Sequence, residues 1–219
     1  MEKLVIFDLD GTLLNTIADL ANCVNHTLSE RNLPLHTLDE YRLMVGNGMR
    51  KLVERALPAT KAADAQYVEN TLAAFLDYYA SNIDLYTRPY PGIPELIETL
   101  SAQGYKLAVA SNKIQAGTET LISKFFPHIG FTSVMGNSPL YPLKPDAALV
   151  EYIMDKAGSD RAHTVMVGDS GTDIQTARNA GIPVIAVTWG FRPRNELEAA
   201  DFMADTTAQV LQAVKEKIH

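Results

Sequence analysis

Two carboxylates, Asp8 and Asp10, follow the apolar run of residues 4–7 and precede Gly11 and Thr12. A continuous apolar run is typical of a strand buried on both faces of a parallel sheet, and such sheets bind ligands beyond the carboxyl ends of their strands. Because side chains two apart along a strand start on one face, both acids can approach the same phosphorus atom or metal ion. The spacing indicates phosphoryl-transfer chemistry, although Asp-Gly is also a common turn sequence.

Three further groups that could do chemistry follow in the chain. Two of them come directly after apolar runs that predict strands over residues 105–110 and 164–168, and the other lies just before a helix start. Since parallel strands end at the same edge of a sheet, we expect these groups to share that edge with the first acid pair. The groups are, in chain order, the pair Ser111 and Asn112, then Lys144, then the acids Asp169 and Asp173.

The elements that would position these groups show two kinds of pattern. Helix and strand patterns alternate from residue 86 onward, which predicts a doubly wound, Rossmann-like parallel sheet with right-handed crossovers. Residues 15–85 carry helical patterns only. We therefore predict an α/β catalytic core of residues 1–14 and 86–219, with residues 15–85 inserted as an α-helical cap.

Local signals divide the expected cap into helices. The Thr16 hydroxyl can cap a first helix, and residues 37–40 form a capping-box signature for a second one that should stop at residues 46–48. A short helix over residues 49–57 and a longer one over 64–81 should follow. Hinges between cap and core are expected near both ends of the insertion.

Composition excludes several classes of protein. The chain has 219 residues, a net charge of −7 and no basic cluster, which argues against nucleic acid or an anionic membrane as principal partner. We see no membrane-length apolar run and no leader with a cleavage site, and therefore expect a cytoplasmic protein. The single cysteine, Cys23, rules out a disulfide framework. No metal-ligand spacing links the histidines, which are His26, His36, His128, His163 and His219.

The order acid pair, hydroxyl, lysine, acid pair resembles the four motifs of the haloacid dehalogenase-like hydrolase superfamily, over almost the whole chain. The resemblance implies that Asp8 is a nucleophile that forms an aspartyl-phosphate, a known use of carboxylates. It implies that Asp10 protonates the leaving alcohol and then takes a proton from the attacking water. The backbone carbonyl of Asp10 is a further metal ligand in that family.

A divalent cation would reduce the repulsion between nucleophile and phosphate. Carboxylate ligands without histidine or thiolate favour Mg²⁺. Besides the first acid pair, Asp169 and Asp173 are candidate ligands, and Asp173 either binds the metal directly or positions groups that do.

The phosphoryl oxygens need donors as well. Ser111 and the Asn112 backbone amide can supply them, unless the pair is an ordinary helix cap, and Gly11 and Thr12 are assigned to the same phosphate-binding set. Lys144 would place a positive charge against Asp8 and the transferring group, unless it is a solvated surface lysine.

The cap segment of residues 45–57 closely resembles the corresponding segment of phosphoglycolate phosphatases. Gly46, Asn47 and Gly48 would let the backbone approach a substrate closely, or they form a plain turn between helices. Arg50 would bind a substrate carboxylate, or it is an exposed helical arginine. The turn of residues 189–192 is expected to pack at the sheet edge, although it could also close the floor of the site.

We therefore predict a Mg²⁺-dependent phosphatase that hydrolyses a small phosphorylated metabolite, of the phosphoglycolate phosphatase type. A phosphomutase of the β-phosphoglucomutase type would use the same core and a similar cap. A non-catalytic phosphate-binding module is a third alternative, which has no need for a nucleophile with an acid partner. The sequence does not decide the oligomeric state.

Overall fold

The computed structural model describes residues 1–218, so the expectation for His219 lies outside the described residues. Its core is a six-stranded parallel sheet in the order β5-β4-β1-β6-β7-β8. The chain fills one side of the central β1 and then the other, which confirms the predicted doubly wound fold. The strands are β1 (Leu4–Phe7), β4 (Lys106–Ile114), β5 (Ser133–Asn137), β6 (Thr164–Gly168), β7 (Val184–Val187) and β8 (Phe202–Ala204).

Alternate residues of β1 pack into two separate hydrophobic cores. Val5 and Phe7 lie in one core with α6, α7 and α10, while Leu4 and Ile6 lie in the other with α8 and α9. Each fully buried aliphatic side chain stabilises the fold by about 1.5–3 kcal/mol. The helices are α6 (Ile93–Ala102), α7 (Gln115–Phe125), α8 (Ala148–Ala157), α9 (Gly171–Ala180) and α10 (Thr207–Lys217), with short 3₁₀ turns at Arg161–His163 and Arg194–Glu196.

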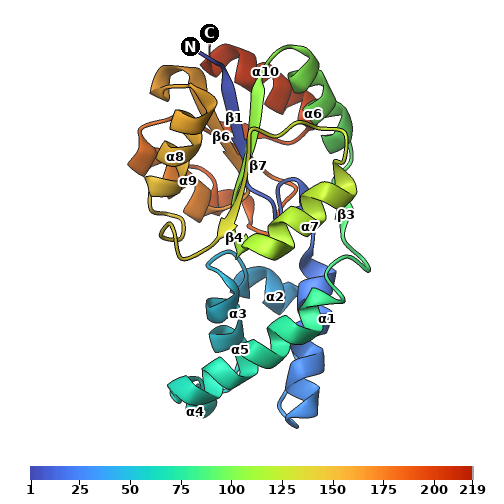
Figure 1. Cartoon of the computed structure of the whole chain (residues 1–219). Helices are drawn as coiled ribbons and strands as arrows, with labels where there is room; N and C mark the ends of the chain where they lie inside the picture. The colour runs from blue at the N-terminus through green and yellow to red at the C-terminus, as the bar shows by residue number, and fades with distance from the viewer. Residues whose placement is uncertain (219) are drawn as a thin grey trace.

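A helical cap covers the carboxyl ends of the strands (Figure 1). It is connected to the core by the short antiparallel strands β2 (Leu14–Asn15) and β3 (Arg88–Pro89). Phe75 and Tyr79 stack at a ring-centroid distance of 5.3 Å in its core. Among the described helices, none is both long and apolar enough to cross a membrane. The cap helices are α1 (Ile17–Glu30), α2 (Leu38–Met44), α3 (Met49–Ala56), α4 (Ala59–Ala62) and α5 (Ala65–Ala80).

Two local expectations differ from the structure. Thr37 and Glu40 form the predicted capping box of α2, but the hydroxyl of Thr16 does not cap α1. It donates instead to Oδ1 of Asp10, at 2.7 Å. The strand expected over residues 105–110 also continues to Ile114 as β4, because Ile114 pairs with β5 after an irregularity in the ladder.

Candidate active site

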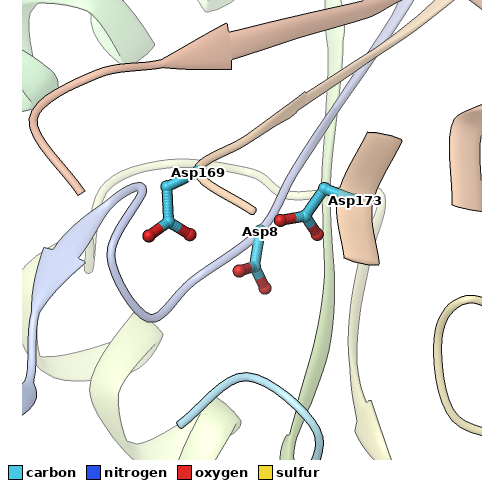
Figure 2. A group of neighbouring side chains, drawn as sticks. All are labelled: Asp8, Asp169 and Asp173. Carbon is cyan, nitrogen blue, oxygen red and sulfur yellow. The ribbon is translucent and has the colours of Figure 1, made fainter. Parts of the chain in front are cut away.

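Three buried acids gather at the carboxyl end of the sheet (Figure 2). Asp8 follows β1, Asp169 follows the neighbouring β6, and Asp173 lies in the first turn of α9. Because β1 and β6 are paired in parallel, Asp8 and Asp169 leave the sheet side by side. One carboxylate oxygen from each acid lies within 4.8 Å of those of the other two. This spacing suits a shared cation with oxygen ligands.

Lys144 connects two of these acids. Its ammonium group donates to Oδ1 of Asp8 at 2.9 Å and to Oδ1 of Asp173 at 2.6 Å. Its backbone is held by the side chain of Asn112, which accepts from the Lys144 amide at 2.8 Å and donates to the Lys144 carbonyl at 3.0 Å. Lys144 is thus a buried, fixed cation beside Asp8, and its surface alternative is excluded.

Burial and mutual repulsion shift the titration of the cluster. Desolvation, opposed by the charge of Lys144 and reinforced by that of Asp173, raises the pKa of Asp8 to about 7. Desolvation and the charges of Asp173 and Asp8 raise the pKa of Asp169 well above its ordinary value. Burial alone would lower the pKa of Lys144, but the two carboxylates outweigh it and raise that pKa. Such a cluster favours binding of a cation, which opposes these shifts on the acids.

The loop after β7 completes the environment of Asp169. The Phe191 amide donates to Oδ2 of Asp169, and the Trp189 indole donates to the Thr12 carbonyl at 3.2 Å. The turn of residues 189–192 therefore closes the floor of the site, which was the alternative to the expected packing at the sheet edge. Gly11 packs directly against Asp169 from below the cavity, because its φ is +89° and a Cβ there would lie 2.3 Å from Oδ2 of Asp169.

Asp10 is held by two donors. Oδ1 accepts from the Thr16 hydroxyl at 2.7 Å, and the Lys113 ammonium donates to Oδ1 at 2.9 Å and to Oδ2 at 3.1 Å. Sequence reasoning missed Lys113, although it lies two residues beyond Ser111 in the same strand. The Lys113 amide also donates to the Ser111 hydroxyl oxygen at 3.2 Å.

These groups line one cavity between core and cap, with about 40 Å³ open to the centre of a water molecule. The cap contributes the backbone of Gly46 and Gly48 together with the apolar side chains of Leu20, Met49 and Leu52. Gly11, Thr12, Asn47 and Arg50 do not line it. The cavity brings together nine of the residues selected from the sequence, namely Asp8, Asp10, Gly46, Gly48, Ser111, Asn112, Lys144, Asp169 and Asp173.

The cap loop of residues 43–48 is bound directly to the core. Arg192 donates to the carbonyls of Leu43 at 3.2 Å and Val45 at 2.7 Å, and Asn112 donates to the Gly46 carbonyl at 3.2 Å. Arg192 also lines the cavity. Sequence reasoning did not select it, because its role depends on how the cap sits on the core.

Arg50 and Asn47 point elsewhere. Arg50 pairs with Glu54 of its own helix and with Glu69 of α5, at 2.8 Å to the latter, and its side chain is 51 % exposed. Asn47 accepts from Arg55 at 2.9 Å and approaches the Thr172 hydroxyl at 3.4 Å. The structure does not bring the guanidinium of Arg50 to the cavity.

Comparisons with known proteins agree with this geometry. A model of the haloacid dehalogenase-like hydrolase family matches residues 5–187. A phosphoglycolate phosphatase of Mesorhizobium japonicum is 38% identical over 196 residues, covering 89% of this chain and 86% of the relative. One of Agrobacterium fabrum is 37% identical over 222 residues, covering 100% and 94%. The crystal structure of a predicted phosphoglycolate phosphatase from Haemophilus somnus has a TM-score of 0.88 and 32% identity, covering 97% of both chains.

Proposed function

The chain belongs to the haloacid dehalogenase-like hydrolase family, and we propose that it is a magnesium-dependent phosphatase that works through an aspartyl-phosphate. It is a phosphoric monoester hydrolase of the phosphoglycolate phosphatase-like branch. The observation that carries the mechanism is the position of Asp8, a buried carboxylate at a central strand end, between Lys144 and Asp169.

The residues present fit a magnesium ion. Asp8 and Asp169 would bind it with carboxylate oxygens, and Asp10 with its backbone carbonyl. Asp173 fits better as the residue that orients Lys144, because its other oxygen accepts from the amide and hydroxyl of Ser170 at 3.2 Å and 2.6 Å. A divalent cation would offset the excess of negative charge in the site, since four acids face three cations: Asp8, Asp10, Asp169 and Asp173 against Lys113, Lys144 and Arg192.

When bound, Mg²⁺ would hold carboxylate and phosphoryl oxygens together and neutralise negative charge in the transition state. Asp8 and Asp10 then carry out the first half-reaction, the transfer of the phosphoryl group to the enzyme. A carboxylate oxygen of Asp8 attacks phosphorus, the bond to the leaving oxygen breaks, and Asp10 gives that oxygen a proton. Lys144 and the donors at Ser111 and Asn112 bind the phosphoryl oxygens as their charge redistributes.

The second half-reaction returns Asp8 to its starting state. Asp10, now a carboxylate, takes a proton from a water molecule as that water attacks the phosphorus of the acyl phosphate. The bond between phosphorus and the Asp8 oxygen breaks, inorganic phosphate leaves, and Asp10 is again protonated. One acid serves both steps because the steps occur in sequence.

We propose phosphoglycolate as the substrate. The support is the name of the relatives at 37–38% identity and the packing of the cap on the core, which leaves about 40 Å³ of the cavity open to the centre of a water molecule. A two-carbon leaving group suits this space better than a hexose. At Gly46 and Gly48 the cap loop would bring its backbone close to the substrate, while Met49 and Leu52 beside it present apolar side chains.

A steady-state screen of phosphate monoesters with Mg²⁺ tests the proposal, with phosphoglycolate expected to have the highest kcat/KM. Asp8→Asn should abolish turnover and phosphoryl-enzyme formation, detected by mass spectrometry of the quenched protein, with the circular dichroism unchanged. Asp39→Asn, on an 89 % exposed side chain, is the matched control. Activity of Asp8→Asn within tenfold of wild type would refute the mechanism. Conversion of β-glucose 1-phosphate to glucose 6-phosphate would favour the phosphomutase alternative.

A further inference from the structure

Lys113 is a buried cation that the proposed chemistry does not use. Its side chain is 0 % exposed, and its ammonium group lies between the Asp10 carboxylate and the face of the Tyr79 ring, 5.1 Å from the ring centroid. Asp10 belongs to the loop after β1, Lys113 to β4, and Tyr79 to cap helix α5. One ammonium group therefore contacts the acid of the core and an aromatic ring of the cap.

Burial of the Lys113 ammonium group has a free-energy cost that some interaction must offset. Transfer of an ammonium ion out of water is costly unless it is paired, and apolar residues often replace a buried ion pair without loss of stability. In the described part of the chain, both hydrogen bonds of the Lys113 ammonium go to Asp10. The ring face of Tyr79 supplies a further attraction without a hydrogen bond. The pair fixes the position of Asp10 at the cavity, which a methionine of similar length would not do.

We propose that Lys113 is a positioning residue for the acid–base carboxylate, and that Tyr79 holds Lys113 in place when the cap covers the core. The inference rests on the proposed role of Asp10. Lys113 fixes the position of the Asp10 carboxyl group at the cavity, so that proton transfer to the leaving oxygen and from the attacking water starts from one place. Displacement of Tyr79 with the cap would loosen Lys113 and, through it, Asp10.

The contact with Tyr79 depends on the ring and not on the hydroxyl. The Tyr79 hydroxyl is buried and makes no hydrogen bond with the described residues. Tyr79→Phe therefore keeps the ring face and is the matched control for Tyr79→Leu, which removes it.

The experiment compares Lys113→Met, Asp10→Asn and the double variant. With phosphoglycolate, whose alcohol must be protonated to leave, Lys113→Met should lower kcat about 10- to 100-fold, part of the usual contribution of general acid–base catalysis. First-turnover release of p-nitrophenolate from p-nitrophenyl phosphate should stay within about twofold, since this anion leaves without a proton. In the Asp10→Asn background, Lys113→Met should cost less than about twofold further.

Independent variants and controls keep the test decisive. Tyr79→Leu should lower kcat for phosphoglycolate in the same direction, and Tyr79→Phe should stay near wild type; equal behaviour of the two would remove Tyr79 from the proposal. Lys113→Gln repeats the charge removal if Lys113→Met does not fold. Equal losses on both substrates, or an additive loss in the Asp10→Asn background, would overturn the positioning role. Wild-type activity of Asp10→Asn would instead refute the proposed function itself.

Discussion

The backbone amide of Phe191 donates a 2.7 Å hydrogen bond to Oδ2 of Asp169. This bond fixes one oxygen of the carboxylate and leaves Oδ1 free of donors among the described residues, available to a cation. The approach is possible because residue 190 is glycine: a Cβ there would lie 2.2 Å from Cβ of Asp169. The floor of the site therefore depends on glycine at position 190, which has no side chain, as well as on the acids.

Gly190→Ala should displace Asp169 or the loop that carries it. We expect kcat/KM to fall by at least about tenfold and the free energy of unfolding to fall by about 1–3 kcal/mol, the usual cost of overpacking. Steady-state kinetics and chemical denaturation measure the two effects. Gly130→Ala is the control, because nothing lies within 4 Å of a Cβ at Gly130. Equal behaviour of the two variants would contradict the packing argument.

Magnesium binding should depend on pH through Asp8. Its pKa of about 7 in the folded protein lies above the ordinary 3.8, so between these values the folded state keeps a proton that the unfolded chain has lost. Through this group, rising pH lowers the stability of the metal-free protein over that interval. Below about pH 7 the metal must also displace this proton, weakening binding about tenfold per pH unit.

Thermal denaturation at about pH 5.5 and about pH 8 checks this expectation. The Mg²⁺-induced rise in Tm should be larger at the higher pH, and Asp8→Asn should lose most of the difference. A Mg²⁺-induced rise that is the same at both pH values would count against Asp8 as a ligand that must lose a proton.

Two cap-related arginines should behave differently. Arg50→Ala removes exposed ion pairs, so kcat/KM for phosphoglycolate should stay within about twofold of wild type. Arg192→Met removes the two bonds to the carbonyls of Leu43 and Val45, and kcat/KM should fall about tenfold, consistent with loss of a charge-assisted hydrogen bond. A loss for Arg50→Ala that is confined to phosphoglycolate, with p-nitrophenyl phosphate unaffected, would restore Arg50 as a carboxylate ligand.

Calcium should inhibit phosphatase turnover, whereas magnesium should support it. Ca²⁺ accepts more oxygen ligands at longer distances and can occupy both oxygens of the Asp8 carboxylate, leaving none to attack phosphorus. Chelation should abolish turnover, Mg²⁺ should restore it, and Ca²⁺ added to the Mg²⁺ enzyme should lower the rate. Equal initial rates with either ion in a steady-state assay would show that the site is not tuned to Mg²⁺.

The strand-end residues were predictable because local sequence defines both the strand and its end. Asp8 and Asp169 follow the ends of β1 and β6, Ser111 follows the apolar run of residues 105–110, and parallel pairing brings these positions together. Lys113 was within reach of the same argument, because residues two apart along a strand share a face. It was missed because the strand was expected to stop before Ser111, whereas β4 continues past it.

The cap residues were harder to predict, because their roles depend on how one domain packs on the other. On α3, Met49 lines the cavity and Arg50 does not, since one residue along a helix turns the side chain by about 100°. The spacing of the buried residues of α3 already separates an apolar face from Arg50, but it does not indicate whether that face packs within the cap or lines a cavity against the core. Arg192 binds carbonyls of a segment about 150 residues earlier in the chain. Every residue has a backbone carbonyl, so the sequence does not indicate which of them a distant arginine will bind.

The two connections to the cap also bear on how such a protein changes over evolutionary time. Leu14 pairs with Pro89 and Asn15 with Arg88, so the chain leaves the core and returns to it at adjacent points. A segment whose two ends already meet can be lengthened, shortened or exchanged without moving a strand of the sheet. The cap is in this sense a replaceable cassette, and a new leaving group could be accommodated by exchanging it while Asp8, Lys144 and Asp169 keep their places.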